Sequence, residues 1–293
     1  MEKRLTIFTP TFNRAYILNN LYKSLLQQTS NDFNWMIVDD GSTDNTELIV
    51  DDWMSEGKID IIYYHQENSG KMAAHNFAVE HTKSELFLCV DSDDYLVDNA
   101  VELLIREWDK NKNDNTIGVI ARRGTKDGKK MGNGVFPNVT IANLKDFLGK
   151  TFTGDTSLCF ETNILKKYKF PIIEGEKFIS ESYLYDQINR DYDYIIYDEI
   201  IIVCEYRPDG YTMNMDLISF KNPIGRMYHE VQNLKFSTKF SDRIKACTRY
   251  NIYKNICKHD DIYDFKLNER LLMIITSLPG KILYLKKKKR LGL

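Results

Sequence analysis

The first 110 residues alternate between short apolar runs and longer amphipathic segments, and this alternation restricts the possible folds more than any other feature of the sequence. Apolar runs of strand length cover 5–9, 35–40, 59–65 and 86–91. Segments of helical period cover 15–28, 43–56, 70–82 and 98–111. Strands that are apolar on both faces and alternate with helices are typical of a parallel sheet covered on both sides. We therefore expect an α/β fold.

Beyond residue 111 the pattern becomes mixed and then helical. Strands are predicted at 117–123, 157–160, 194–198 and 200–206, and a helix at about 181–190. Helical periodicity begins near Met215, and further helices are predicted at 241–258 and 264–277. We divide the chain into one domain at 1–212, with halves at 1–110 and 111–212, and a helical C-terminal region at 213–293.

Composition excludes several classes of protein. The chain is 43% hydrophobic and 28% charged, which is typical of a globular protein, and its formal net charge of -2 argues against a general nucleic-acid binder. The five cysteines form no CxxC pair, so we expect reduced thiols rather than a zinc site. The first residues contain no apolar core of a signal peptide, and no uncharged apolar run reaches about 18 residues. We therefore expect a cytoplasmic protein.

Four polar clusters follow predicted strands, and together they predict a ligand site. Their sequences are TPTFNR (9–14), DDGSTD (39–44), NSGK (68–71) and DSDD (91–94). Each cluster alone could be a turn followed by a helix cap. However, the carboxyl ends of parallel strands meet at one edge of a sheet, and open α/β sheets bind ligands beyond that edge.

The carboxylates of these clusters indicate a divalent cation. We expect convergence of five of them, namely Asp39, Asp40, Asp91, Asp93 and Asp94. Clustered carboxylates raise one another's pKa unless a cation lies among them. Oxygen ligands without histidine or cysteine favour Mg²⁺ or Mn²⁺, which usually also bind substrate phosphates. The implied ligand is therefore a diphosphate. The chain has neither the P-loop motif GxxxxGK[ST] nor the dinucleotide-binding motif GxGxxG, so a nucleotide-sugar explains this diphosphate best.

In this order, PTFNR, VDDGSTD, NSGKMAAHN and DSDD resemble the inverting glycosyltransferases of family 2, which have the GT-A fold. The resemblance is specific over residues 4–110 and looser over 151–210. It implies a Rossmann-like, mostly parallel central sheet with helices on both faces. It also implies metal-dependent transfer from a UDP-sugar to a glycan. The chain lacks the QxxRW motif of processive members, so transfer of a single sugar is expected.

The resemblance assigns donor-binding roles to several residues. Pro10 and Thr11 would form the floor beneath the nucleotide. Asp39 would hydrogen-bond the base, usually uracil, and Asp40 would shape the same turn. Lys71 matches a basic residue near the base and the phosphates.

The segment Asp91-Ser92-Asp93 matches the family's DxD motif. Asp91 would face the ribose and Asp93 the metal, Mn²⁺ or Mg²⁺. Asp94 is expected to cap the next helix, or to reach the metal through water. Arg14 is either a solvated residue at a helix start or a ligand contact.

Inverting transfer needs one general base on the acceptor side. The resemblance places it in PIIEGEKFISESYLYDQI, and we assign Glu181, at the predicted start of a helix, with Asp186 as the alternative. The family usually has a second carboxylate next to the base, where this chain has Ser182. Glu181 could instead be an ordinary first-turn glutamate. Asp155 is a further candidate on the acceptor side.

The C-terminal segment combines apolar residues with the basic run Lys286–Arg290 and Lys281, and it contains no acidic residue after Glu269. Such a segment suits contact with an anionic membrane through 281–290, at the inner face of the cell membrane. A solubilising end is the alternative. With membrane contact, we expect a lipid-linked glycan acceptor, as used by bacterial family members that build surface polysaccharides.

Two other functions remain open from the sequence. A nucleotidylyltransferase also builds a nucleotide-sugar site on an α/β sheet, but it needs a glycine-rich basic signature that PTFNR does not supply. A catalytically inactive scaffold that binds sugar nucleotides or glycans is favoured by the incomplete Glu181-Ser182 pair and opposed by the intact DSDD. The sequence specifies neither the sugar nor the oligomeric state.

Overall fold

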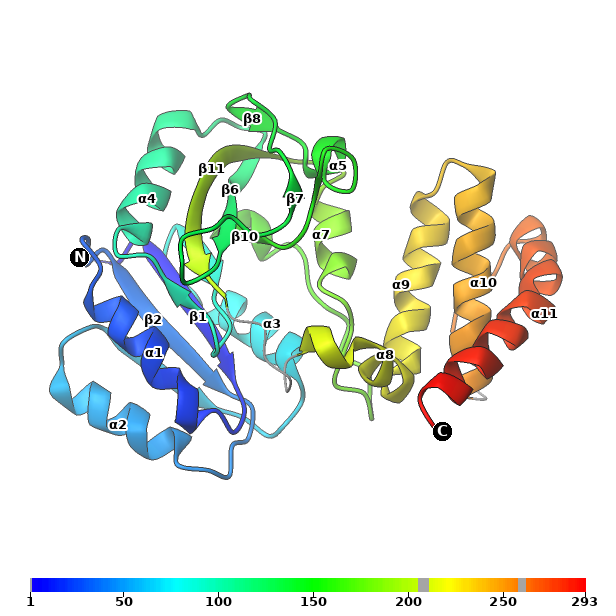
Figure 1. Ribbon diagram of the computed structural model, residues 1–293, viewed down its shortest axis with the longest axis horizontal. Helices are drawn as coiled ribbons and strands as arrows, with labels where there is room; N and C mark the ends of the chain where they lie inside the picture. Colours follow the sequence, from blue (N-terminus) through cyan, green and yellow to red (C-terminus); the bar gives the residue numbers. More distant parts are fainter. Residues whose placement is uncertain (1, 205–210, 258–261) are drawn as a thin grey trace. The chain divides into compact units, whose positions relative to one another are not determined.

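The computed structural model describes residues 2–204, 211–257 and 262–293. Contacts between residues divide the chain into two units. The first consists of Met1–Lys169 and Tyr185–Glu205, and the second of Phe170–Leu184 and Tyr206–Leu293. The first unit contains the sheet, and the second is mainly helical (Figure 1).

The first half of the sheet is parallel, as expected. Its strands lie in the order β3-β2-β1-β4, with bounds β1 (Leu5–Thr11), β2 (Phe33–Asp39), β3 (Ile61–His65) and β4 (Leu86–Cys89). The connecting helices are α1 (Ala15–Leu26), α2 (Thr46–Glu56) and α3 (Lys71–His81). Figure 1 shows α1 and α2 running beside β1 and β2. The predicted strand–helix alternation is thus confirmed.

The second half of the sheet is mixed. It continues from β4 in the order β10-β6-β11-β5, with β10 antiparallel to both neighbours and β11 parallel to β6. The bounds are β5 (Tyr95–Leu96), α4 (Ala100–Asn111), β6 (Thr116–Gly124), β8 (Ile141–Ala142), α5 (Leu144–Phe147), β10 (Thr156–Glu161), α6 (Thr162–Leu165) and β11 (Asp193–Val203). Strands β7 (Asn133–Gly134) and β9 (Phe152–Thr153) form a separate pair.

Two sequence predictions about strands were wrong. The strands predicted at 194–198 and 200–206 form one strand, β11, up to Val203; its pairing with β6 shifts between Tyr197 and Ile200, so the polar residues there mark an irregularity rather than an end. Likewise, β1 does not end at Thr9, as predicted, but continues through Pro10 to Thr11. The backbone of Phe8, and therefore that of Pro10, faces β4, which ends at Cys89, so no ladder bond is lost at Pro10.

Both faces of the sheet are covered. On one face Ile7 and Trp35 pack with apolar residues of α1, α2 and α4 in a single core. On the other face the ring of His75, in α3, lies edge-on to Phe8 and Phe87, with centroids 5.9 and 5.5 Å away. This arrangement leaves the strand ends open for loops.

The second unit contains α8 (Tyr211–Lys221), α9 (Pro223–Phe236), α10 (Phe240–Cys257) and α11 (Leu267–Arg290), and α7 (Ser182–Ile188) crosses the division. The predicted helical stretch from Met215 divides before Pro223, which favours a first helical position. Helix α11 does not end at 277 as predicted but continues through Pro279. The hydrophobic core of the second unit includes Met227, Tyr250 and Leu272.

All five cysteines are free, as expected; Cys159 and Cys247 are buried and the others half-buried. Within the ranges that the structure describes, no helix has both the length and the apolar character required to cross a membrane.

Candidate active site

Asn13 joins the polar loops that follow β1 and β2 into one structure. Its side-chain Oδ1 accepts a hydrogen bond from the Thr43 backbone amide at 2.7 Å, and its backbone amide donates to Ser42 Oγ at 2.8 Å. Asn13 has a φ of 53°, a left-handed conformation that asparagine tolerates better than most residues. Sequence reasoning missed this role, although an asparagine just before a helix is a typical signal for such a turn.

Asp39 is fully buried at the end of β2. Its Oδ1 accepts from the Ser42 amide and its Oδ2 from the Tyr63 hydroxyl, both at 2.8 Å. Burial, and then this bond to Asp39, raise the pKa of Tyr63. The turn needs Gly41, whose φ is 84° and whose added Cβ would lie 3.0 Å from the Asn68 amide nitrogen. Asp39 is therefore held rigidly at the sheet edge.

Thr11 pairs with Asp39 in the β1–β2 register and adds an unsatisfied group. Its Oγ1 is buried and has no hydrogen-bond partner in the described chain. Buried hydroxyls without a partner are rare, and a bound ligand would supply one. This geometry suits the predicted position of Thr11 beneath a nucleotide.

Asp40 holds the loop before α3. Its Oδ1 accepts from Gln66 Nε2 at 2.7 Å and from the Ser69 amide at 2.8 Å, and its Oδ2 accepts from the Gly70 amide at 2.8 Å. Asp40 thus accepts three hydrogen bonds from the chain and Asp39 only two, so the geometry favours a positioning role for Asp40 over direct contact with a nucleotide.

Asp40→Ala should lower the free energy of unfolding by about 1–3 kcal/mol, because it leaves backbone donors at the start of α3 without their acceptor. Urea unfolding measures the change. Asp52→Ala, at an exposed position in α2, is the matched control and should change stability by at most about 0.5 kcal/mol. Equal stability of the two variants would contradict the positioning role.

The acidic cluster after β4 contains an ion pair. Lys71 Nζ, at the start of α3, lies 2.6 Å from Asp91 Oδ1. Burial alone would raise the pKa of Asp91, but Lys71 and Arg123 outweigh it and hold that pKa below its usual value. Ser92, between the two aspartates of the motif, is buried.

The neighbouring carboxylates behave differently. Burial, followed by the charge of Asp91, raises the pKa of Asp93. Burial raises the pKa of Asp94 to about 7, although Arg123 Nη1 lies 2.9 Å from its Oδ2 and opposes the shift. The expectation that Asp94 caps the next helix was wrong, because β5 intervenes and α4 begins after Asn99.

Arg123, at the end of β6, is a site residue that sequence reasoning missed. It also contacts Cys204 Sγ at 3.5 Å, and the charge of the exposed Asp155 acts on it. The only available signal was an arginine at the end of an apolar strand.

Arg14 is half-buried, and its charge acts on both Asp91 and Asp93. Of the two roles considered for Arg14, this favours a ligand contact in the candidate site over a solvated position at a helix start.

The five carboxylates expected to converge therefore fall into two groups. Asp91, Asp93 and Asp94 act on one another electrostatically, with Lys71 and Arg123 supplying positive charge. Asp39 and Asp40 are instead satisfied by neutral donors, namely Ser42 and Tyr63 for Asp39 and the loop before α3 for Asp40.

The acidic cluster fits a divalent cation held through Asp93. In the described ranges, no three His, Cys, Asp or Glu side chains converge as a protein-only metal site. Mg²⁺ and similar ions are commonly bound by one or two carboxylates together with substrate phosphates and water. A cation would relieve the unfavourable environment that raises the pKa of Asp93.

Glu181 and Asp186 both lie at α7. Glu181 is half-buried immediately before the first residue of the helix, in the second unit, whereas Asp186 lies within the helix, in the first unit. Five residues correspond to a rotation of about 140° around a helix axis, so this spacing does not align the two residues on one face of α7.

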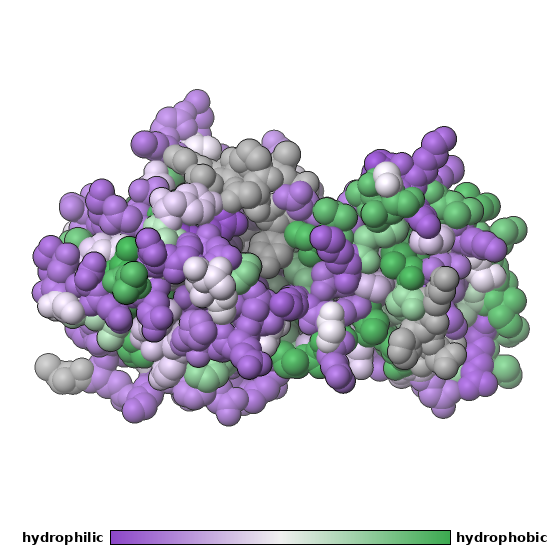
Figure 2. Space-filling model, turned by 90° about the horizontal axis from the view of Figure 1, so that it is seen from below, coloured by the Kyte–Doolittle hydropathy of each residue, from purple (hydrophilic) through white to green (hydrophobic). Residues whose placement is uncertain are grey.

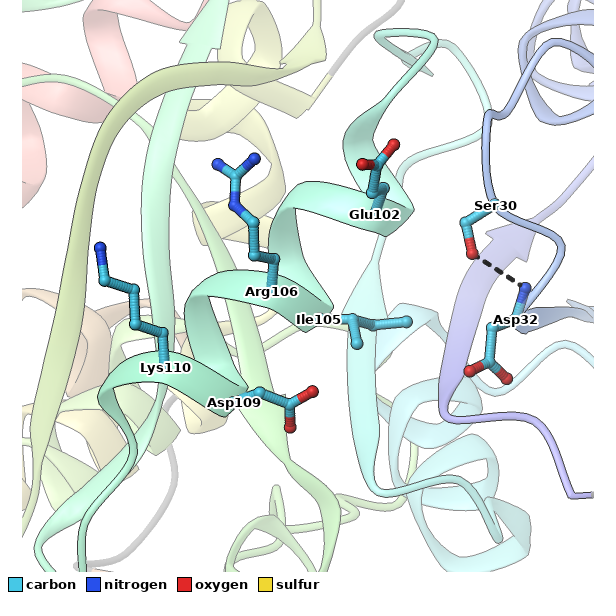
Figure 3. Close-up of a pocket in the computed structure, with 7 residues that line it drawn as sticks. All are labelled: Ser30, Asp32, Glu102, Ile105, Arg106, Asp109 and Lys110. Carbon is cyan, nitrogen blue, oxygen red and sulfur yellow. Dashed lines mark hydrogen bonds between the residues drawn. The ribbon is translucent and has the colours of Figure 1, made fainter.

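A separate open pocket of about 570 Å³ lies elsewhere, between α4 and the loop before β2 (Figure 3). Its lining includes Asp32, Glu102 and Arg106. Asp32 precedes β2, at the amino ends of the parallel strands, whereas the acidic cluster follows the carboxyl end of β4. This pocket is therefore distinct from the candidate site.

Comparisons with known proteins identify relatives of this chain. The family model described as "Glycosyl transferase family 2" matches residues 6–169. The Campylobacter jejuni protein named "GalNAc(5)-diNAcBac-PP-undecaprenol beta-1,3-glucosyltransferase" is 23% identical over 253 residues, or 84% of this chain and 80% of the relative. Several other bacterial relatives are matched over less than two thirds of their own length.

Two solved structures share the fold. Staphylococcus aureus TarS 1–349 in complex with UDP-GlcNAc has a TM-score of 0.58 at 18% identity, over 99% of this chain and 92% of the other. Mannosyltransferase PcManGT from Pyrobaculum calidifontis, in complex with GDP-Man and Mn²⁺, has a TM-score of 0.55 at 15% identity, over 98% and 84%. These likenesses confirm the expected GT-A fold.

Proposed function

The chain belongs to glycosyltransferase family 2 and is a glycosyltransferase, and from this premise we propose that it transfers a single sugar from a UDP-sugar to a lipid-linked glycan with inversion. The observation that carries the proposal is the acidic cluster at the carboxyl edge of the sheet. There, Asp91 is paired with Lys71, and Asp93 is left in an environment that disfavours its charge. The UDP-GlcNAc complex of TarS supports a UDP-sugar donor.

The donor would lie across the ends of β1, β2 and β4. Thr11 offers an unsatisfied buried hydroxyl to the nucleotide, and Asp39 is held rigidly beside it with Pro10. Lys71 would orient Asp91 toward the ribose through their ion pair. Asp93 would hold Mn²⁺ or Mg²⁺, which when bound neutralises charge on the departing diphosphate.

Acceptor activation would depend on one carboxylate. Glu181 takes the proton of the acceptor hydroxyl as that oxygen forms a bond to the anomeric carbon. The bond from this carbon to the diphosphate oxygen breaks, and its electron pair leaves with the UDP. Attack opposite the leaving group inverts the configuration. Asp186 is the alternative base, and Asp155 would contact the acceptor.

The acceptor would be a lipid-linked glycan, and the enzyme would act at the inner face of the cell membrane. The Campylobacter relative, whose name includes a PP-undecaprenol glycan, supports this acceptor class. The basic segment 281–290 would provide contact with the anionic membrane surface.

Asp39→Ala should weaken UDP binding about 5- to 150-fold, because a hydrogen bond to the base in a buried site contributes roughly 1–3 kcal/mol. Titration calorimetry with UDP measures this. Tyr63→Phe removes the hydroxyl that supports Asp39 but keeps the carboxylate, so its effect should be smaller. Normal UDP affinity in Asp39→Ala, with failure to bind the UDP-sugar, would move Asp39 from the base to the sugar or the metal.

The proposed function is tested by UDP release from a panel of UDP-sugars, with and without Mn²⁺. Metal-dependent release with at least one sugar is expected. An inactive scaffold would bind a sugar nucleotide and release no UDP from any donor. NMR of the product gives the anomeric configuration relative to the donor, and retention would rule out the inverting scheme.

A further inference from the structure

Helix α11 carries an exposed apolar stripe along its length. The stripe consists of seven aliphatic residues that are 46% to 78% exposed: Leu267, Leu271, Ile274, Ile275, Leu278, Ile282 and Leu285. At 100° per residue they fall within an arc of about 100°. Figure 2 shows hydrophobic residues gathered on the part of the molecule that holds the C-terminal helices. Scattered apolar side chains need no explanation, but a continuous stripe of this length does.

The opposite face of α11 is already used for packing. Its buried residues are Glu269, Leu272, Thr276 and Gly280. Asn251 of α10 donates to Thr276 Oγ1 at 2.9 Å, and a Cβ added to Gly280 would lie 2.5 Å from the Asn251 Cβ. The stripe therefore faces away from the surface that fixes α11 to its own unit, and it is available for another occupant.

Positive charge surrounds the end of the stripe. Lys287 and Arg290 pair with Asp216 of α8, at 3.3 Å for Lys287. The other four lysines of the segment are exposed, namely Lys281, Lys286, Lys288 and Lys289. Long basic side chains beside an apolar face reach the lipid headgroups while that face enters the boundary of the acyl chains.

We propose that the apolar stripe of α11 is a membrane-docking surface that lies in the plane of an anionic bilayer, with the exposed lysines contacting lipid phosphates. This extends the proposed membrane contact of 281–290 to the whole helix and rests on it, but it is independent of the transfer chemistry. It makes insertion of aliphatic side chains, rather than charge alone, the main source of attachment.

Charge argues against a second copy of the chain as the occupant. A parallel pair of α11 helices would bring two basic ends together. An antiparallel pair would place each basic end against residues 266–271 of the other, where Lys266 and Arg270 are basic and Glu269 is buried beside Arg243. An anionic bilayer, in contrast, offers negative charge to the basic end of α11 and an apolar interior to the stripe.

Vesicle flotation of the full chain tests the proposal, with phosphatidylcholine vesicles compared to vesicles containing about a third phosphatidylglycerol. Wild type should bind the anionic vesicles far better. Ile274→Gln with Leu278→Gln should lower binding at least about 100-fold. Lys286→Gln, Lys288→Gln and Lys289→Gln together should lower it about 100-fold and weaken its salt dependence.

Matched controls come from exposed residues elsewhere. Leu48→Gln with Ile172→Gln removes equally exposed apolar groups, and Lys23→Gln, Lys145→Gln and Lys150→Gln remove the same charge; both control sets should bind vesicles like wild type. UDP release without acceptor should stay unchanged in every variant, so loss of docking is distinguished from loss of activity or fold.

Two outcomes would overturn the proposal. One is binding of the Ile274→Gln, Leu278→Gln variant to anionic vesicles as tightly as wild type. The other is a wild-type dimer in sedimentation that this variant abolishes, without vesicle binding by either protein. The second result would assign the stripe to a second copy of the chain.

Discussion

Asp93→Ala should abolish sugar transfer and most of the metal-dependent affinity for the donor. A bound cation stabilises charge on the departing diphosphate by several kcal/mol, so the expected loss in turnover is about 10³-fold or more. Asp93 is the proposed ligand because burial and Asp91 both disfavour its charged form, whereas Asp91 is already paired with Lys71. UDP release and calorimetry with UDP and Mn²⁺ measure the two effects.

Two further variants serve as comparisons for Asp93→Ala. Asp91→Ala should be nearly as severe, because it removes the proposed ribose contact and leaves Lys71 without its partner. Asp52→Ala, on the exposed side of α2, should leave turnover unchanged. Unchanged Mn²⁺-dependent UDP affinity in Asp93→Ala would refute the metal assignment, even if turnover fell for another reason.

Glu181→Gln should retain UDP-sugar affinity and metal dependence while kcat falls at least about a hundredfold. A general base contributes typically 10²- to 10⁴-fold to the rate and little to donor binding. Glutamine keeps the size and hydrogen bonding of glutamate but cannot take the acceptor's proton. Single-turnover transfer with a saturating donor separates the chemical step from binding.

Asp186→Asn is the matched comparison, because Asp186 lies within the short helix that Glu181 immediately precedes. It should remain active if Glu181 is the base. The reverse pattern, with slow Asp186→Asn and active Glu181→Gln, would assign the base to Asp186. If both variants transfer at the wild-type rate, a single base at α7 is excluded, and the anomeric configuration of the product becomes the deciding measurement.

The sequence by itself determined the parallel half of the sheet and the sheet edge at which the candidate site lies. Alternating apolar runs and helical periods report local geometry, and each strand end carries its polar cluster within a few residues. Residues such as Asp39 and Asp93 could therefore be assigned to one sheet edge without any knowledge of packing. The ordered motifs around them were also sufficient for the family, which the comparisons confirmed.

Contacts between distant residues were decided only by the tertiary structure. Arg123 reaches Asp94 because β6 lies in the same sheet as β4, with β10 between them, and no local pattern encodes that order. The partners that satisfy Asp40 belong to a loop more than 25 residues further along the chain. In α11, apolar residues occur on both faces, so periodicity could not show which face packs on α10 and which is exposed. Side-chain patterns specify elements and faces, whereas packing between elements selects the pairs of residues that meet.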